Sequence, residues 1–242
     1  MILTNKNSIV EGLKSGSVRS VLVREGARRD AKVLTIIELC GRMNVPLRIG
    51  GAGSRRQSAG EGGPAVTAER RVFEYAGADE VYEGAARGGL RAAVALDHVQ
   101  DPGNLGALIR LCAAAGVSGL VIERRGCCGV TDAAADTSSG GIERVKIARA
   151  ANLAGSLSKA KEKGLWVVGA DESAERDCWS FDFAFPLVLV MGGEGMGLSR
   201  PVKKVCDDLV RVPADPAFPT LNVAVAAGVL VFELLRRRAA GG

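Results

Sequence analysis

The second half of the chain is dominated by short, uninterrupted apolar segments, and these constrain the fold more than any other feature. LWVVGA (165–170) and PLVLVMG (186–192) show no alternation of polar and apolar residues. Such segments are typical of strands that helices cover on both faces, as in a parallel sheet. The same part of the chain supplies further predicted strands at 93–96, 119–122 and 208–213, and predicted helices at 104–115, 152–163 and 222–238. From residue 93 onward we therefore predict an α/β fold with a parallel sheet.

The first 90 residues predict a smaller α/β unit. Asp30 is placed to cap a helix with an apolar face, and strands are predicted at 20–24 and 45–49. Residues 50–64 contain six glycines and one proline, which predicts a loop, and a short helix is predicted at 68–75. We therefore predict a first domain over residues 1–78, a linker over 79–92 and a second domain over 93–242.

The composition excludes several classes of protein. Of 242 residues, 47% are hydrophobic and 24% are charged, so the chain can bury a core and is not a disordered polymer. It has no apolar run near the roughly 20 residues that cross a bilayer, and no signal-peptide pattern, so we expect a cytoplasmic protein with no membrane partner. The one histidine and the six cysteines, which lack Cys-x-x-Cys spacing, predict no metal site and reduced thiols.

The positive charge is concentrated near the N-terminus. The net charge is +5, and residues 1–90 hold 14 Lys and Arg against 10 Asp and Glu. Arg55 and Arg56 lie in the glycine-rich loop, and long loops of this kind often have a function. These two arginines are candidate contacts for a polyanion such as RNA, although ordinary solvated charge explains the excess equally well.

The first of three turns that follow predicted strands is LDHVQDPGNLGALIRLCAAAG (96–116). Asn104 is a plausible helix N-cap, and Gly106 permits close approach of the backbone. Arg110, six residues after Asn104, stands among apolar neighbours, where a guanidinium usually meets a carboxylate or a phosphate. An exposed helix arginine with no partner is the alternative for this position.

The second and third turns are VLVMGGEGMGLS (188–199) and the segment 209–238. Glu194 lies inside the glycine loop of the second turn, where it would repel phosphates and suit a neutral or cationic ligand, or pair with Arg110. In the third turn, Thr220 or Asn222 is expected to cap a helix rich in small residues. Ligands of parallel sheets bind beyond the carboxyl ends of the strands, so the three turns are expected to converge on one site.

Taken together and in this order, the three segments resemble the three motifs of the SpoU family of RNA ribose 2′-O-methyltransferases, in the SPOUT superfamily. DPGNLGALIR (101–110) is similar to the first motif, MGGEGMGL (191–198) to the second and PTLNVAVAAGVLVFE (219–233) to the third. The resemblance covers the chain from about residue 96 to residue 238. The N-terminal part resembles the small L30e-like RNA-binding domain that precedes the catalytic domain in many members.

The resemblance implies a knotted fold that binds S-adenosylmethionine, and a homodimer with the 222–238 helix at the interface. It implies that Gly192, Val212 and Leu221 contact the cofactor, largely through backbone groups. The roles that it implies for four other residues are catalytic: Glu194 and Asn222 would orient neighbouring groups, and Asn104 and Arg110 would face the substrate. Arg110 would act on the ribose hydroxyl as a base, or would clamp the phosphate and the hydroxyl oxygen.

Three functions remain open on the sequence. The first is an RNA 2′-O-methyltransferase that acts on ribosomal RNA or, as second choice, on transfer RNA. The second is an RNA-binding protein of the same fold that has lost catalysis, although the chain retains Asn104, Arg110, Glu194 and Asn222. The third is a nucleotide-dependent oxidoreductase, which the absence of a dinucleotide fingerprint disfavours.

Overall fold

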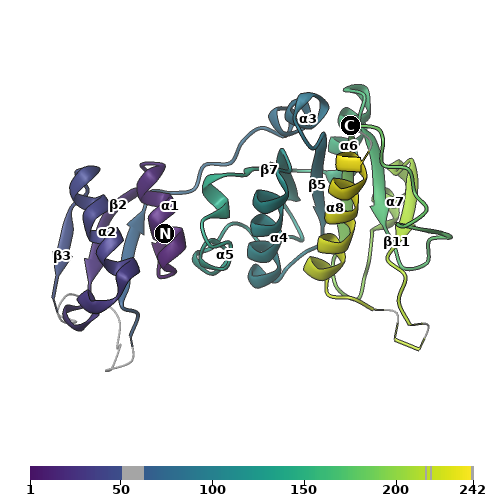
Figure 1. Ribbon diagram of the computed structural model, residues 1–242. Coiled ribbons are helices and arrows are strands. Elements are labelled where there is room, and N and C mark those ends of the chain that lie inside the picture. The colour runs from purple at the N-terminus through teal and green to yellow at the C-terminus, as the bar shows by residue number, and fades with distance from the viewer. Residues whose placement is uncertain (51–62, 216, 219, 241–242) are drawn as a thin grey trace.

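The polypeptide forms two sheets that belong to two successive domains (Figure 1). The computed structural model describes residues 1–50, 63–215, 217–218 and 220–240. The N-terminal domain contains a four-stranded sheet and the second domain a seven-stranded sheet. This confirms the predicted α/β class and the predicted parallel sheet of the second part.

The N-terminal sheet has the order β1 (Ile2–Leu3), β4 (Val66–Arg70), β2 (Val18–Val23) and β3 (Leu47–Ile49). The helices α1 (Lys6–Lys14) and α2 (Ala31–Arg42) accompany it, and the short 3-10 helix η1 (Glu25–Arg29) precedes α2. Asp30 caps α2 as predicted, because its carboxylate accepts hydrogen bonds from the amides of Lys32 and Val33. The predicted helix at 68–75 is wrong: the segment begins inside β4, which pairs antiparallel with β1 and β2.

The seven-stranded sheet has the order β7-β6-β5-β10-β8-β11-β9, and every pairing recorded within it is parallel. The bounds of its strands are β5 (Ala92–Asp97), β6 (Gly119–Glu123), β7 (Lys146–Ala150), β8 (Trp166–Ala170), β9 (Arg176–Asp177), β10 (Leu187–Gly192) and β11 (Asp208–Arg211). β5 is buried along its whole length, and β10 is buried up to Gly192. Their uninterrupted apolar sequences are explained by this burial on both faces.

Helices cover both faces of this sheet. On one face lie α4 (Pro102–Ala115), α5 (Asp132–Thr137), the 3-10 helix η2 (Gly141–Glu143) and α8 (Val223–Ala240), which pack with Val94 and Leu96 of β5. On the other lie α3 (Ala78–Arg87), α6 (Leu153–Glu162) and α7 (Arg200–Val205), which pack with Ala93 and Ala95. The helices α4 and α8 lie side by side (Figure 1). No helix in the described part of the chain is long and apolar enough to cross a membrane.

The connection between the domains lies earlier in the chain than predicted. Residues 79–92 were expected to be a linker, but most of them form α3, which packs against β5, β6 and β7 of the second sheet. The segment that joins the two sheets is 71–77, and its Ala76 forms a parallel bridge with Ala148 of β7. The Gly- and Ala-rich composition of 84–89 obscured the apolar face of α3, on which Val81, Tyr82 and Ala85 are buried.

A buried polar junction fixes the N-terminal domain against α5 and η2. Arg70 at the end of β4 pairs with Glu143 of η2 at 2.8 Å, and both side chains are less than one tenth exposed. The same carboxylate accepts hydrogen bonds from the hydroxyls of Ser15 and Ser17. The carboxylate of Asp136 in α5 accepts hydrogen bonds from the backbone just before α1. The two domains are therefore held together by bonds between residues more than 70 positions apart.

Candidate active site

Three polar side chains from the three turns form one hydrogen-bonded network at the carboxyl edge of the large sheet. The amide nitrogen of Asn104, in α4, donates to Oε1 of Glu194 at 2.9 Å. The amide nitrogen of Asn222, just before α8, donates to the same oxygen at 2.8 Å and to Oδ1 of Asn104 at 2.9 Å. The structure thus brings together three of the four residues predicted to be catalytic.

The N-cap of α4 is Asp101, so the predicted cap at Asn104 is wrong. The carboxylate of Asp101 accepts a hydrogen bond from the backbone N–H of Asn104 at 2.7 Å, and Pro102 occupies the first helical position. The side chain of Asn104 is therefore free to bind Glu194. Asn222 does act as a cap: its side-chain oxygen accepts hydrogen bonds from the amides of Ala224 and Val225 in α8.

The loop after β10 can be built only with glycine at its first positions. A Cβ atom on Gly192 would lie 2.2 Å from the carbonyl carbon of Gly197, and one on Gly193 would lie 2.2 Å from the carbonyl oxygen of His98. Gly195 and Gly197 have φ angles of +77° and +60°, which side-chain-bearing residues rarely adopt. The loop therefore folds tightly back over the end of β10 and carries Glu194 to the edge of the sheet.

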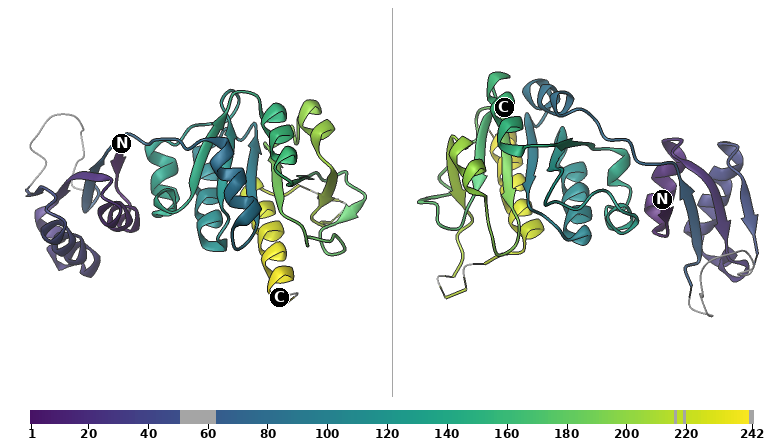
Figure 2. Two further views of the ribbon diagram at one scale, coloured as in Figure 1. Left: turned by 90° about the horizontal axis from the view of Figure 1, so that it is seen from above. Right: turned by 180° about the vertical axis from the view of Figure 1, so that it is seen from behind.

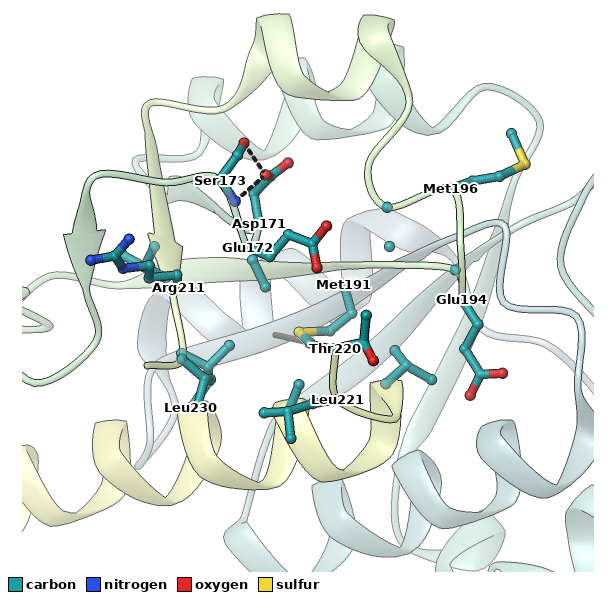
Figure 3. A pocket seen from close by; sticks show the side chains of 18 of the residues that line it. Asp171, Glu172, Ser173, Met191, Glu194, Met196, Arg211, Thr220, Leu221 and Leu230 are labelled. Carbon is teal, nitrogen blue, oxygen red and sulfur yellow. Dashed lines mark hydrogen bonds between the residues drawn. The ribbon is translucent and has the colours of Figure 1, made fainter. Parts of the chain in front are cut away.

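A cavity of about 400 Å³ lies beside this loop, between the ends of β8, β10 and β11 and the start of α8 (Figure 3). It is lined by all three residues expected to contact the cofactor, Gly192, Val212 and Leu221. The other lining residues are Ala170, Asp171, Glu172, Ser173, Met191, Gly193, Glu194, Gly195, Met196, Gly197, Lys203, Val210, Arg211, Thr220, Val223, Ala226 and Leu230. The cavity thus combines an apolar floor with charged groups at its margin.

Acidic side chains outnumber basic ones in this lining. The side chain of Asp171 is 5% exposed and pairs with Lys203, and Ser173 donates to the same carboxylate (Figure 3). Burial alone would raise the pKa of Asp171, but the hydrogen bonds from Lys203 and Ser173 outweigh it and hold this pKa below its ordinary value. Glu172 and Glu194 add two further carboxylates, against Lys203 and Arg211. The cavity therefore suits a ligand with positive charge.

Sequence reasoning missed Asp171 and Glu172, although a signal was available. They follow LWVVGA, and in a parallel sheet the carboxyl end of that strand lies at the same edge as the glycine loop. β8 and β10 are in fact neighbours.

Arg110 lies apart from the cavity. The side chain of Arg110 is exposed on α4, and the residue is not part of the cavity lining. In the described part of the chain it forms no ion pair with Glu194, whose partners are the two asparagine amides. Arg55 and Arg56 lie outside the described residues.

The buried carboxylate of Asp97, at the end of β5, holds the end of the glycine loop by a hydrogen bond. Asp97, fully buried at the end of β5, accepts a hydrogen bond from the amide of Ser199 at 2.7 Å and lies 2.6 Å from Nδ1 of His98. Glu123 is 3.5 Å from the same nitrogen, so ligand atoms of Asp97, His98 and Glu123 lie within 4.8 Å of one another. Both oxygens of Asp97 have hydrogen-bond partners, which identifies it as a structural tie between β5 and the loop after β10.

These features define a class of protein. They are those of an α/β protein that binds a small ligand in a glycine-lined cavity over the carboxyl edge of a parallel sheet, with side chains of three separate turns beside it. The family model described as the SpoU rRNA Methylase family matches residues 91–232. The chain belongs to this family, and it is an S-adenosylmethionine-dependent RNA 2′-O-methyltransferase.

Similar proteins cover nearly the whole chain. A TrmH-family tRNA/rRNA methyltransferase of Bacillus subtilis, YacO, is 36% identical over 234 residues, which cover 96% of this chain and 94% of that protein. The 23S rRNA (guanosine-2′-O-)-methyltransferase RlmB of Xylella fastidiosa is 34% identical over 243 residues, with 96% and 94% covered. The crystal structure of the SpoU methyltransferase AviRb of Streptomyces viridochromogenes has a TM-score of 0.80, 24% identity and coverage of 100% and 90%. The shared fold therefore extends over both domains.

Proposed function

We propose that this enzyme methylates the ribose 2′-hydroxyl of a nucleotide in large-subunit ribosomal RNA. The observation that carries the proposal is the Asn104–Glu194–Asn222 network beside the cavity, because it joins all three motifs at one edge of the sheet. The choice of ribosomal RNA is supported by the likeness to RlmB over both domains. A guanosine is the first nucleotide to test, because that relative is named for one.

The residues of the cavity fit S-adenosylmethionine. Its volume of about 400 Å³ lies in the range of small-molecule sites, and its carboxylates suit the sulfonium and ammonium groups of this ligand. Gly192, Val212 and Leu221 would hold it, largely through backbone groups, with Met191 and Leu230 as apolar contacts. The ligand supplies a methyl group that is already activated on sulfur, so the reaction gives no role to a metal.

The protein's own part in the reaction is to position groups. Asn104 and Asn222 hold the carboxylate of Glu194 in one orientation by two N–H donors to a single oxygen. Arg110 follows Asn104 by six positions in α4, which is roughly 9 Å along the helix axis. Its side chain is exposed. From there it would contact the RNA: we assign it to the phosphate and the hydroxyl oxygen, where it stabilises the negative charge that develops during attack.

The N-terminal domain is assigned to RNA binding. Its small α/β sheet and its excess of basic residues support the resemblance to an L30e-like domain, and Arg55 and Arg56 are its proposed contacts. The knotted path of the catalytic domain is likewise part of the proposal, as is a cytoplasmic location, where ribosomal RNA is found in bacteria.

A homodimer through α8 is supported by an exposed apolar stripe. Val225 and Phe232 are 55% and 47% exposed, and open space lies over Gly228 between them. Their spacing of three and four residues places them on one helical face. Ala227 of the same helix is fully buried in its own chain, so the proposed interface is the Val225–Gly228–Phe232 stripe.

The dimer is tested by replacing Phe232 with glutamate. The charged variant should sediment as a monomer at micromolar concentration where the unchanged protein sediments as a dimer. A monomeric unchanged protein would overturn the proposed assembly.

The function is tested by mapping ribose methylation in ribosomal and transfer RNA of cells with and without this protein. We expect the loss of one 2′-O-methyl group from large-subunit ribosomal RNA. Loss from a transfer RNA instead would redirect the substrate assignment. Binding of S-adenosylmethionine, but not NAD, in calorimetry should accompany either result.

A further inference from the structure

The order of strands in the large sheet determines which strand ends lie between the N-terminal domain and the cavity. The N-terminal domain lies beside the β7 margin, whereas the cavity lies at β10, β8 and β11 (Figures 1 and 2). The carboxyl ends of β7, β6 and β5 therefore lie between them. An RNA that contacts both the N-terminal domain and the cavity crosses these three strand ends.

Three exposed arginines occupy this stretch. Arg149 is the next-to-last residue of β7, and Arg124 and Arg125 follow β6 directly. The backbone N–H of Arg124 donates to the carbonyl of Ala150 at 2.7 Å, which holds the two strand ends together. None of the three forms an ion pair within the described residues, whereas Arg144 and Arg176, which are also exposed, pair with Glu11 and Asp208.

Arg149 is held in place by a tyrosine rather than by a carboxylate. Its guanidinium carbon lies 4.8 Å from the centre of the Tyr75 ring. The hydroxyl of Tyr75 accepts a hydrogen bond from the backbone N–H of Val130 at 2.9 Å, which fixes the ring. A cation–π contact of this kind orients a guanidinium and leaves its five N–H donors available.

The neighbouring backbone is shaped to leave room for this guanidinium. A Cβ atom on Gly129 would lie 2.8 Å from Nη2 of Arg149 and 3.1 Å from the hydroxyl oxygen of Tyr75. Tyr75 belongs to the segment 71–77 that joins the two domains. The connection between the domains thus builds part of this site.

We propose that Arg149, supported by Tyr75 and accompanied by Arg124 and Arg125, binds phosphate groups of the RNA backbone between the N-terminal domain and the active site. Guanidinium groups suit this ligand, because their planar forks match the oxygens of a phosphate. The nearby carboxylate of Asp101 is occupied as the cap of α4, because it accepts a hydrogen bond from the backbone N–H of Asn104. The inference rests on the proposed RNA substrate and adds its path across the enzyme.

The first experiment measures the salt dependence of binding to a large-subunit ribosomal RNA transcript. Arg149→Gln should weaken binding and reduce the slope of log affinity against log salt by roughly 0.7 to 0.9, the loss of one phosphate contact. Lys146→Gln is the matched control, because it removes one exposed charge from the opposite end of the same strand, where Lys146 pairs with Glu80. Arg149→Lys should keep the slope, since it keeps the charge.

The second experiment tests the role of Tyr75 in the same assay. Tyr75→Leu should weaken RNA binding in the unchanged protein and add little in the Arg149→Gln background, because the ring acts through the guanidinium. Tyr75→Phe keeps the ring and should have the smaller effect. Affinity for S-adenosylmethionine and the melting temperature should be unchanged in Arg149→Gln, which separates the site from general loss of structure.

The outcomes separate this inference from the proposed function. Suppose that the slope of log affinity against log salt is the same for Arg149→Gln, Lys146→Gln and the unchanged protein, and that methylation of ribosomal RNA is intact. The proposed phosphate site is then wrong, and the proposed function stands. Additive effects of Tyr75→Leu and Arg149→Gln would remove the tyrosine from the site. An unchanged protein that neither binds nor methylates ribosomal RNA would overturn both proposals.

Discussion

The domain junction, built around Arg70 and Glu143, and the mouth of the active site, formed by Asn104, Glu194 and Asn222, are both polar clusters that join distant parts of the chain. The two clusters differ in how far their side chains are buried. At the junction, the Arg70 and Glu143 side chains are 7% and 8% exposed. At the mouth, Glu194 and Asn222 are exposed, and among the residues that the structure describes the Glu194 carboxylate receives hydrogen bonds from two neutral amide groups. Breaking a buried ion pair leaves an uncompensated charge, whereas an exposed carboxylate can exchange its partners with water or a ligand. The junction is therefore expected to serve architecture and the mouth to serve chemistry.

The two clusters are linked through α4. A Cβ atom on Gly141 of η2 would lie 3.2 Å from the Cα atom of Arg110, so η2 packs directly on the helix that carries Asn104 and Arg110. A Cβ on Gly106 of the same helix would lie 2.6 Å from the carbonyl oxygen of Ala134 in α5. The elements that receive the N-terminal domain are thus the ones that support the catalytic helix.

The largest effect on stability is expected from Arg70→Ala. The change leaves Glu143 buried with the hydroxyls of Ser15 and Ser17 as its remaining partners in the described part of the chain, so the free energy of unfolding should fall by about 3 kcal/mol. Urea unfolding followed by circular dichroism measures this loss. Proteolysis within 71–77 should become faster as the domains separate.

Arg42→Ala is the matched control for the junction. Arg42 and Glu38 form an ion pair in the same domain, but their side chains are 71% and 70% exposed. Its loss should cost less than about 0.5 kcal/mol. Equal losses in the two variants would mean that burial does not distinguish the junction from an ordinary surface pair.

The largest effect on chemistry is expected from Arg110→Ala. Because Arg110 lies outside the cavity, affinity for S-adenosylmethionine should be nearly unchanged, while single-turnover methyl transfer falls by roughly 10²-fold, the effect of removing one transition-state stabiliser. Arg110→Lys should restore little, because a point charge cannot contact phosphate and hydroxyl as a planar fork can. A rate that falls only in proportion to cofactor affinity would remove Arg110 from the catalytic step.

Much of the catalytic domain was predictable from the sequence because its signals are local. The buried strands β5 and β10 are continuous apolar runs, and the glycine loop follows one of them directly. Gly192, Val212 and Leu221 do line one cavity, although contact with the cofactor stays a prediction. The local signal at α4 was misinterpreted: Asp101 and Asn104 both suit an N-cap, and Pro102, which favours the first helical position, selects Asp101.

The junction was not predictable, because its bonds join residues far apart in the chain. Arg70 and Glu143 are separated by 73 positions, and nothing in either segment indicates the other. The same holds for β4, whose identity as a strand depends on its pairing with β1 and β2. Its sequence VTAER also suits a helix, so tertiary pairing decided between the two structures.

Asn104→Ala should have a smaller effect, confined to the mouth. It removes one of two donors to Glu194 and leaves the Asn222 amide in place, so affinity for S-adenosylmethionine should fall by a factor of about five, the value of one hydrogen bond of roughly 1 kcal/mol. The isosteric Asn104→Asp places a second carboxylate against Glu194 and should weaken binding more. Calorimetry measures both variants, and an aspartate variant that binds as well as the unchanged protein would contradict the network's role.

The smallest effect is a pH dependence that belongs to the junction. Burial opposes ionisation of Glu143, but hydrogen bonds from Arg70, Ser15 and Ser17 outweigh it and hold its pKa below the ordinary value of 4.5. A carboxyl group whose pKa is lowered by folding stabilises the protein above its unfolded pKa, and this contribution is lost as the pH falls through the folded pKa.

Urea unfolding between pH 7 and pH 3 should therefore show a decrease in stability that begins near pH 5 for the unchanged protein and is shallower in Glu143→Gln. Glu11, whose pKa is lowered by hydrogen bonds from Lys14 and from Arg144 across the junction, contributes in the same direction, so some dependence should remain. The glutamine variant is less stable at pH 7, and the comparison is therefore between slopes, not between absolute values. Parallel curves of stability against pH for the two proteins would show that the junction does not hold Glu143 ionised. The electrostatic difference between the buried junction and the exposed mouth of the active site would then be contradicted.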